Sequence, residues 1–409
     1  GASAEGGLDG SINYMGRIQG LPEPEAVRMA GMDRIGSADA YAQFNAGWAW
    51  ALDTPFQWTK TVASHLGGTR NGMVLTWPEK IKTPGGLRSQ FGHVNDIVPT
   101  ILEAAGIEAP KEVNGIVQKP MNGTSLVYSF NDAKAPERHT TQYFEVFGNR
   151  AIYHDGWMAS AFHNRLPWNV IATRQTPIEA DTWELYDLRK DFSQSNNLAE
   201  KYPEKLAELK ALFMQEAEAN NVLPLRGQPV TNDLPDLAKG VTRATYHEGT
   251  VSVPEKAVPH MFNRSWSLSS DLDVQDETHG VVATIGGNAA GWSLYLDADR
   301  RPTFTYRMFE LKTVDLKGAP LAPGKAKLKV DFDYDGTGYA KGGKLTLSVN
   351  GQPVASDTLP ATPPAMFSIN ETFDVGIDTG SAAGKYPVDA PLGYSFENGK
   401  IDQVTIELR

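Results

Sequence analysis

The stretch TPFQWTKTVASHLGGTR, residues 54–70, places one lysine between aromatic residues and a pair of glycines. Composition alone favours a plain interpretation, an aromatic-rich helix and a glycine turn with Lys60 in solvent, because lysines are mostly exposed. The other interpretation is a binding site. A turn at Gly67 and Gly68 would let the backbone approach a ligand closely, and Lys60 would offer a compact cation to an anion such as phosphate or sulfate. The residues of this stretch by themselves leave both interpretations open.

Regular elements are predicted on the carboxyl side of this stretch. Met73–Trp77 is a short apolar run between a glycine and a proline, which is typical of a buried strand. Residues 92–106 carry apolar side chains at helical spacing, with Asp96 as the expected N-cap and Gly106 as the expected left-handed residue at the end. Further predicted elements are strands at 150–160 and 183–188 and an amphipathic helix at 203–217.

The last part of the chain has a different character. Residues 226–240 form a polar, proline-containing connector, and beyond it apolar and polar residues alternate in short runs between turns. Such a pattern is typical of a β-sandwich. The clearest runs are Lys327–Asp333, Lys344–Val349 and Gln403–Leu408. We therefore predict three segments, namely an α/β portion at 1–225, the connector at 226–240 and an all-β sandwich at 241–409.

Composition excludes several kinds of site. A chain of 409 residues with 41% hydrophobic side chains can bury a substantial core. The absence of cysteine excludes disulfides, thiolate metal sites and a cysteine nucleophile within the chain. A net charge of −11 argues against a nucleic-acid partner, whose binding needs clustered basic residues. No apolar run approaches the roughly 18 residues of a membrane span.

Several separated blocks of the chain, in the same order, resemble the type I sulfatases and in particular the larger bacterial arylsulfatases. The blocks are TPF–aromatic–K, GG-x-R and WP within residues 54–78, RSQF at 88–91, residues 93–102, residues 142–153 and WELYD at 183–187. The similarity covers most of residues 1–225 and, more loosely, the rest. It implies the carboxy-terminal part of an α/β domain of the alkaline-phosphatase-like class, with a small antiparallel sheet.

The resemblance also implies a chemistry. In that family a hydrated formylglycine attacks the sulfur of a sulfate ester, while calcium and basic side chains stabilise the sulfate oxygens. Lys60 matches the family's sulfate-binding lysine and is the predicted catalytic residue. His65 is a weaker candidate for substrate binding at the edge of the pocket. Arg70 matches the family's arginine after the glycines and is expected to fix the loop.

The opening residues indicate where the family's catalytic groups are expected. In the family, a sequence like Gly1–Gly6 follows an Asp-Asn pair that ligates calcium. The calcium ligands and the nucleophile are therefore expected upstream of Gly1. No metal ligand is predicted within the chain. The expected partners are the amino-terminal part of the same protein and a sulfate ester, and the chain alone is expected to be inactive. The family expectation for location is periplasmic or secreted, and otherwise cytoplasmic.

Two apparent metal motifs have simpler interpretations. His93 and Asp96 lie one helical turn apart, but an N-cap role explains Asp96 without a metal. Asp331, Asp333 and Asp335 fit the first half of an EF-hand loop, yet its twelfth position is a glycine instead of the bidentate glutamate. We interpret that segment as a strand that runs into an acidic turn.

Two alternatives to a sulfatase stay open. The chain could be a non-catalytic glycan-binding module, for which Trp266 and Trp292 of the sandwich are available, although both fit a core equally well. The parent protein could instead be a phosphatase or phosphonate hydrolase of the same superfamily. The loop 154–168, rich in His and Trp, could line a cleft or join the small sheet to its surroundings.

Overall fold

The chain forms two compact units. The computed structural model describes residues 2–37, 40–163, 166–169, 177–227, 236–309 and 311–409. One unit consists of Gly1–Asp9 and Phe44–Val230, and the other of Gly10–Gln43 and Thr231–Arg409. Residues 10–43 therefore belong to the second unit, whereas the sequence placed them within one segment at 1–225. The other predicted boundaries stay predictions, and the connector at 226–240 lies largely outside the described residues.

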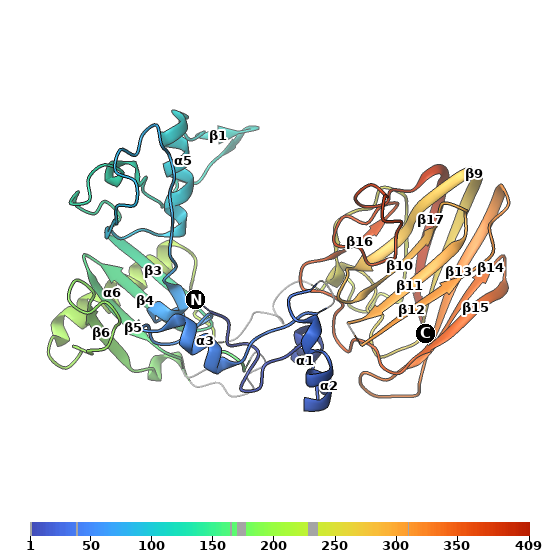
Figure 1. Cartoon of the computed structure of the whole chain (residues 1–409), viewed down its shortest axis with the longest axis horizontal. Coiled ribbons are helices and arrows are strands. Elements are labelled where there is room, and N and C mark those ends of the chain that lie inside the picture. The colour runs from blue at the N-terminus through green and yellow to red at the C-terminus, as the bar shows by residue number, and fades with distance from the viewer. Residues whose placement is uncertain (1, 38–39, 164–165, 170–176, 228–235, 310) are drawn as a thin grey trace. The chain divides into compact units, whose positions relative to one another are not determined.

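The first unit is built on a four-stranded antiparallel sheet in the order β3-β4-β5-β6 (Figure 1). Its strands are β3 Thr141–Val146, β4 Asn149–His154, β5 Trp157–Ala161 and β6 Trp183–Asp187. The prediction of one strand at 150–160 is wrong, because Asp155 and Gly156 take positive φ values of 47° and 81° and turn the chain into a hairpin. The strand predicted at 183–188 is confirmed.

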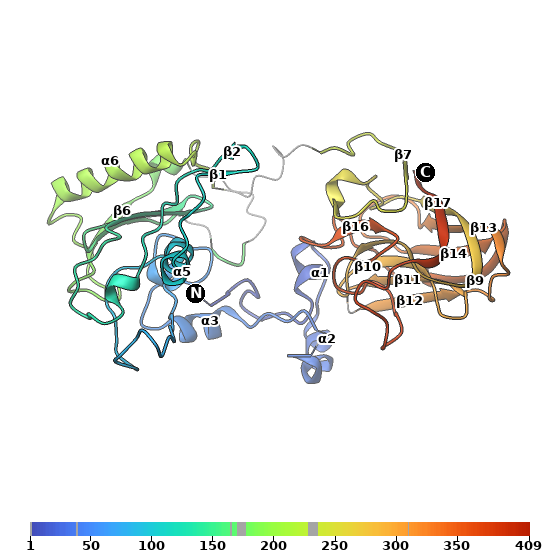
Figure 2. The ribbon, with the colours of Figure 1, turned by 90° about the horizontal axis from the view of Figure 1, so that it is seen from above.

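The two faces of this sheet hold different parts of the chain, because successive side chains of a strand point in opposite directions. Ile152, Ala159 and Leu185 pack against helix α6, Pro203–Ala219, whose buried residues are Leu209, Phe213 and Ala217. Figure 2 shows α6 running along the sheet. Ala151 and Met158 point the other way and pack with Leu66. The sheet thus carries α6 on one face and the stretch 54–70 on the other.

Several shorter elements complete the first unit. They are α3 Ala46–Asp53, α4 Leu66–Thr69, the 3-10 turns Val94–Asp96, Val127–Ser129 and Ile178–Ala180, α5 Ile97–Ala105, and the two-stranded hairpin β1 Glu112–Val113 and β2 Ile116–Val117. Helix α5 ends at Gly106, whose φ of 68° confirms the predicted left-handed end.

Asp96 stands at the predicted N-cap position of α5, but its side chain makes no cap hydrogen bond to that helix. A 3-10 turn, Val94–Asp96, precedes α5 and has His93 as its own N-cap. Asp96 is the third residue of that turn, and its carboxylate accepts the His93 backbone N–H at 2.7 Å, which closes a capping box. Asp96 also accepts hydrogen bonds from the Thr124 backbone and from His139, both at 2.7 Å. Both carboxylate oxygens of Asp96 therefore accept hydrogen bonds within the protein, which indicates a structural role.

The strand predicted at Met73–Trp77 does not form. Within the described ranges no strand pairs with this run, and the Val74 side chain is 92% exposed. An apolar run becomes a strand only where neighbouring strands supply hydrogen bonds to its backbone. The described residues supply no such neighbour here.

The second unit is an all-β structure centred on β9, Trp266–Gly286. The first half of β9 pairs with β13 and β17, and its second half pairs with β10 and β16. The other strands are β7 Arg243–Tyr246, β8 Val253–Pro254, β10 Gly291–Leu296, β11 Pro302–Met308, β12 Lys312–Lys317, β13 Gly324–Tyr334, β14 Gly343–Val349, β15 Gln352–Leu359, β16 Thr372–Val375 and β17 Glu397–Leu408, with a 3-10 turn at Glu255–Ala257. The three strands predicted from alternation lie within β13, β14 and β17.

The strands of this unit form one eleven-stranded sheet, in which the long β9 joins the part around β13 and β14 to the part around β10 and β11, and the core lies between these two parts. The ring centroid of Trp266, on β9, lies 6.4 Å from the ring centroids of Trp292 on β10 and Phe304 on β11. Trp266 and Trp292 are 2% and 0% exposed and belong to one hydrophobic cluster. These contacts give the sandwich arrangement that the alternating runs predict.

Residues 10–43 complete the second unit with α1 Tyr14–Ile18, α2 Glu25–Ala30 and a 3-10 turn at Met32–Arg34. Met15 of α1 is 3% exposed and joins the sandwich core. The side-chain oxygen of Gln19 accepts the backbone N–H groups of Ala365 and Met366 at 3.1 and 3.0 Å. This early segment is thus bound to the sandwich by packing and by hydrogen bonds.

Candidate functional site

Lys60 lies in a tight loop whose backbone is unusual. Trp58 and Thr61, on either side of it, have φ values of 66° and 76°. Non-glycine residues with positive φ are uncommon and cost free energy, and they cluster at binding and catalytic sites. The loop closes through a hydrogen bond from the Val62 N–H to the Thr59 carbonyl at 3.2 Å. The stretch that the sequence singled out therefore holds its lysine in a strained, well-defined turn.

The glycine pair makes this loop possible. A Cβ on Gly67 would lie 2.1 Å from the carbonyl oxygen of Trp58, and one on Gly68 would lie 2.1 Å from that of Val62. Both distances are far below contact, so only glycine lets α4 pack this closely. The close approach expected at this pair is therefore made to the Lys60 loop itself.

The side chain of Lys60 has a carboxylate partner in the opening residues. Its Nζ lies 2.9 Å from both Oε1 and Oε2 of Glu5. The Lys60 side chain is 52% exposed, whereas that of Glu5 is only 12% exposed. The ammonium therefore has one side toward a nearly buried carboxylate and one side toward solvent.

Backbone contacts also bind the opening residues to this loop. The Lys60 N–H donates to the Ala2 carbonyl at 2.9 Å. The Ala2 N–H donates to the two carboxylate oxygens of Asp53 at 2.8 and 2.9 Å. Residues 2–5 thus form one wall beside the lysine.

A strand of the sheet fixes the other side of the loop. Asn149, at the start of β4, donates from Nδ2 to the Thr61 carbonyl at 3.2 Å and accepts the His163 backbone N–H on Oδ1 at 2.9 Å. The ring of Trp58 stacks on Phe162 with centroids 4.1 Å apart. The hydroxyl of Thr59 is buried and has no hydrogen-bond partner among the described residues. This leaves one unused polar group next to Lys60.

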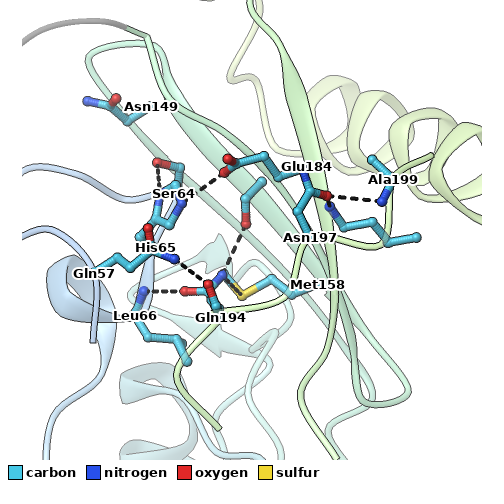
Figure 3. Close-up of polar contacts among 12 residues, drawn as sticks. Gln57, Ser64, His65, Leu66, Asn149, Met158, Glu184, Gln194, Asn197 and Ala199 are labelled. Atoms are coloured by element: carbon cyan, nitrogen blue, oxygen red, sulfur yellow. Dashed lines mark hydrogen bonds and ion pairs between the residues drawn. The ribbon is translucent and has the colours of Figure 1, made fainter. Parts of the chain in front are cut away.

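His65 is buried and both of its ring nitrogens are used. Nδ1 lies 2.9 Å from the Ser64 hydroxyl, and Nε2 lies 3.0 Å from Oε2 of Glu184 on β6 (Figure 3). The hydrogen bond with His65 lowers the pKa of the Glu184 carboxyl. Ser64 and His65 are 0% and 2% exposed. The Ser–His–carboxylate order resembles a nucleophile triad, but a hydroxyl with no exposed surface cannot reach a substrate.

Gln194 is a buried residue that connects the same segment to the sheet. Its Oε1 accepts the Leu66 N–H at 2.7 Å, and its Nε2 lies 3.3 Å from the Ser160 hydroxyl (Figure 3). Its carbonyl accepts a hydrogen bond from the Gln57 side chain. Gln194 therefore holds both ends of the loop that carries Lys60.

Other residues singled out in the sequence have structural contacts. The guanidinium of Arg70 lies 4.2 Å from the ring centroid of Phe192 and 5.3 Å from that of Phe56, which agrees with a loop-fixing role. His163, from the loop 154–168, is 5% exposed and lies 3.0 Å from Asp181, which also pairs with Arg150. Residues 164–165 of that loop lie outside the described residues.

Sequence reasoning assigned Lys60 and His65 but not their partners. Asn149 and Glu184 lie inside the sequence blocks that carry the family resemblance, and Glu5 lies in the opening residues Gly1–Gly6 that also resemble the family; these positions are the signal that could have found them. Gln194 lies outside every block and gave no signal. The predicted roles of Lys60 in catalysis and of His65 in substrate binding stay predictions.

Neither a metal-binding cluster nor a membrane-spanning helix is found among the described residues. Among the described residues, no group of three or more His, Asp or Glu side chains could hold a metal ion. In the same residues, no helix is both long enough and apolar enough to cross a bilayer. Since Trp266 and Trp292 are buried in the sandwich core, they are not available to stack on a glycan.

Comparison with known proteins gives a family for part of the chain. Residues 65–220 match the family described as N-sulphoglucosamine sulphohydrolase, C-terminal. An uncharacterized sulfatase of Schizosaccharomyces pombe is 27% identical over 208 residues, which are 50% of this chain and 35% of that protein. An N-acetylglucosamine-6-O-sulfatase of Bacteroides thetaiotaomicron is 27% identical over 151 residues, 35% of this chain and 24% of that protein. The chain thus spans no more than 35% of the length of either relative.

Solved structures give only weak similarity. The Ruminococcus gnavus IT-sialidase CBM40 covers 40% of this chain and 91% of that chain, with 11% identity and a TM-score of 0.29. A structure from work on the metabolism of multiple glycosaminoglycans by Bacteroides thetaiotaomicron covers 38% of this chain and 31% of that chain, with 19% identity and a TM-score of 0.29. Scores this low carry no argument. The similarity to sulfatases therefore rests on sequence: residues 65–220, which include the sheet β3–β6 and helix α6, match the carboxy-terminal region of a sulfatase family.

Proposed function

We propose that the whole protein hydrolyses sulfate monoesters and that this chain supplies the lysine that binds the sulfate group. The observation that carries the proposal is the loop around Lys60. It combines two strained residues with a half-exposed ammonium, and it directly precedes the region that matches the sulfatase family. A fixed and accessible cation is suited to an anionic oxygen.

The role of Lys60 in the reaction would be electrostatic. Negative charge accumulates on the ester oxygen and the sulfate oxygens as the bond to sulfur breaks, and a positioned ammonium stabilises that charge more than it stabilises the ground state. Glu5, Asn149 and Gln194 would keep the ammonium and its loop in place. His65 would support the edge of the pocket by joining the loop to β6 through Glu184.

The nucleophile and calcium of this proposal would come from the rest of the whole protein. The described residues do not fit a calcium ion, since they contain no group of three suitable side chains. No step is therefore assigned to a metal in this chain. When bound elsewhere, calcium would polarise the sulfate oxygens, and formylglycine would supply the attacking oxygen.

The ester class is a finer part of the proposal. The sequence blocks favour an aryl sulfate, as in the larger bacterial arylsulfatases. The matched family and one matched protein have names that refer to sugars, N-sulphoglucosamine sulphohydrolase and N-acetylglucosamine-6-O-sulfatase. A sugar sulfate is therefore the second candidate substrate.

Binding of 4-nitrophenyl sulfate to the chain tests the site, followed by NMR at the amides of residues 58–62. Lys60→Met should abolish the shifts, whereas Lys119→Met, at another exposed lysine, should leave them unchanged. Equal shifts in the unchanged protein and in the Lys60 variant would refute the site.

A further inference from the structure

We propose that Glu5 shifts the selectivity of the Lys60 site away from doubly charged phosphate esters and toward singly charged sulfate esters. This inference rests on the proposed function, because it concerns the same anion site. It assigns a specificity role to a residue that contacts Lys60 from the opening segment of the chain.

The geometry gives the ammonium a permanent counter-ion. Both oxygens of Glu5 lie 2.9 Å from Lys60 Nζ, and the Ser3 hydroxyl donates to Oε2 of the same carboxylate at 3.0 Å. Two of the three N–H donors of the ammonium can thus be used by Glu5, and the third remains for a ligand. Since Glu5 is the more buried partner, the lysine is held by the carboxylate and not the reverse.

An anion bound at this lysine would therefore lie near two opposite charges. The ammonium attracts it, and the carboxylate, directly behind the ammonium, repels it. Repulsion grows in proportion to the charge of the ligand. A sulfate monoester carries one negative charge, whereas a phosphate monoester carries about two above its second pKa of ~6. Glu5 thus penalises the phosphate ester about twice as strongly.

The size of this penalty can be bounded. At a separation of roughly 6 Å, one extra charge pair contributes about a 3- to 10-fold change in affinity for effective dielectric constants between ~80 and ~40. Replacing Glu5 by a neutral residue should therefore change the ratio of the two affinities by this factor. Lys60 is half-exposed but Glu5 is only 12% exposed, so the stability of each variant is measured beside its affinities.

The same charge arrangement has a consequence for the reaction product. Free sulfate carries two negative charges, one more than the ester from which it forms. Glu5 therefore weakens the binding of the product more than it weakens the binding of the substrate. Glu5 would in this way promote release of sulfate after each turnover.

The test compares 4-nitrophenyl sulfate and 4-nitrophenyl phosphate as ligands of the full chain at about pH 8, where the phosphate is doubly charged. Dissociation constants are measured by NMR titration for the unchanged protein, Glu5→Gln, Glu5→Asp and Lys60→Met. Glu5→Gln keeps the side-chain length and removes the charge, whereas Glu5→Asp keeps the charge. Thermal unfolding of each variant checks that it is folded.

Relative to the unchanged protein, Glu5→Gln should shift the affinity ratio toward the phosphate ester by roughly 3- to 10-fold, and Glu5→Asp should keep most of the original ratio. A ratio unchanged by Glu5→Gln, with binding still lost in Lys60→Met, would overturn the role of Glu5 and leave the site intact. Binding unaffected by Lys60→Met, or undetectable for both esters, would overturn the site itself.

Discussion

Asn149 of β4 donates a hydrogen bond to the carbonyl of Thr61, the residue that follows Lys60, at 3.2 Å. The antiparallel sheet and the loop of the candidate site are thereby connected through one side chain that is 1% exposed. The same side chain accepts the backbone N–H of His163. A residue 88 positions away in sequence thus fixes the loop on one side, as Glu5 does on the other.

Replacing Asn149 by alanine should both destabilise the protein and weaken anion binding. Two buried backbone groups would lose their partner, and each such group costs about 1–3 kcal/mol. The Lys60 loop would also lose its attachment to β4. Urea unfolding measures the first effect and titration with 4-nitrophenyl sulfate the second. A folded variant with unchanged affinity would show that β4 does not position the lysine.

Alanine at Gly67 should be strongly destabilising, and alanine at Gly72 should be nearly neutral. The new Cβ at residue 67 would lie 2.1 Å from the Trp58 carbonyl oxygen, whereas at residue 72 nothing lies within 4 Å. Overpacking of this kind costs about 1–3 kcal/mol or more, and an unhindered surface change stays within about 0.5 kcal/mol. Thermal unfolding of both variants makes the comparison. Equal melting temperatures would contradict the close packing of α4 on the loop.

Helix α6 contributes to stability through one face. Phe213→Ala should lower the free energy of unfolding by about 3–5 kcal/mol, because this ring is fully buried against the sheet. The next residue, Met214, is 46% exposed, and Met214→Ala should cost less than about 1 kcal/mol. Denaturant unfolding distinguishes the two. A similar cost for both variants would argue that α6 does not pack on this sheet.

Glu255 should make the second unit sensitive to pH. Burial raises the pKa of its carboxyl from 4.5 to about 7, although the backbone N–H groups of Phe367 and Ser368 hydrogen-bond to it. Between these two pH values the folded protein binds the proton more tightly than the unfolded chain does. Stability contributed by this group is therefore complete below about pH 4.5, falls as pH rises through about 7, and is then constant.

The variant Glu255→Gln removes this titration and keeps the shape of the side chain. The difference in melting temperature between the variant and the unchanged protein should move in favour of the variant as pH rises from about 5 to 8, by an amount equivalent to about 1–3 kcal/mol. Differential scanning calorimetry at several pH values measures it. A difference that does not depend on pH would mean that Glu255 stays ionised in the folded state.

The chain by itself should not hydrolyse 4-nitrophenyl sulfate. The described residues contain the sulfate-binding lysine of the proposal, but the hydroxyl of Ser64, beside His65, is fully buried, and no metal cluster is present among them. A chromogenic assay with mass-verified protein checks this. Turnover that survives purification and disappears in Lys60→Met would show that the chain holds a complete active site.

Elements whose partners are local could be predicted from the sequence. Helix α6, the left-handed end of α5 at Gly106 and the alternating strands of the sandwich each depend on neighbours within a few residues or on one apolar face. The hairpin at Asp155–Gly156 was missed because the strand-like pattern runs through a two-residue turn. The strand at Met73–Trp77 was wrong because a buried strand depends on neighbouring strands, which a local pattern cannot supply.

In the candidate site, too, residues close in sequence could be predicted and residues distant in sequence could not. Lys60 and the glycine pair could be found because they lie in one short, distinctive stretch. Glu5, Asn149 and Glu184 reach this stretch from 55, 88 and 119 positions away. Contacts over such separations are set by the packing of the loop on the sheet. The family-like segments draw attention to these residues, but which of them contacts the Lys60 stretch follows only from the fold.

The assignment of residues 10–43 to the second unit has a practical consequence. The polypeptide passes between the units near residues 9, 43 and 230, so neither unit is continuous in sequence. A recombinant piece that begins at residue 231 would lack Met15 in its core and the two backbone hydrogen bonds to Gln19. To divide this protein into independently folding halves, the early segment must therefore be joined to the sandwich again. Proteolysis near residue 230 alone would leave the two units connected through the chain at residues 9–10 and 43–44.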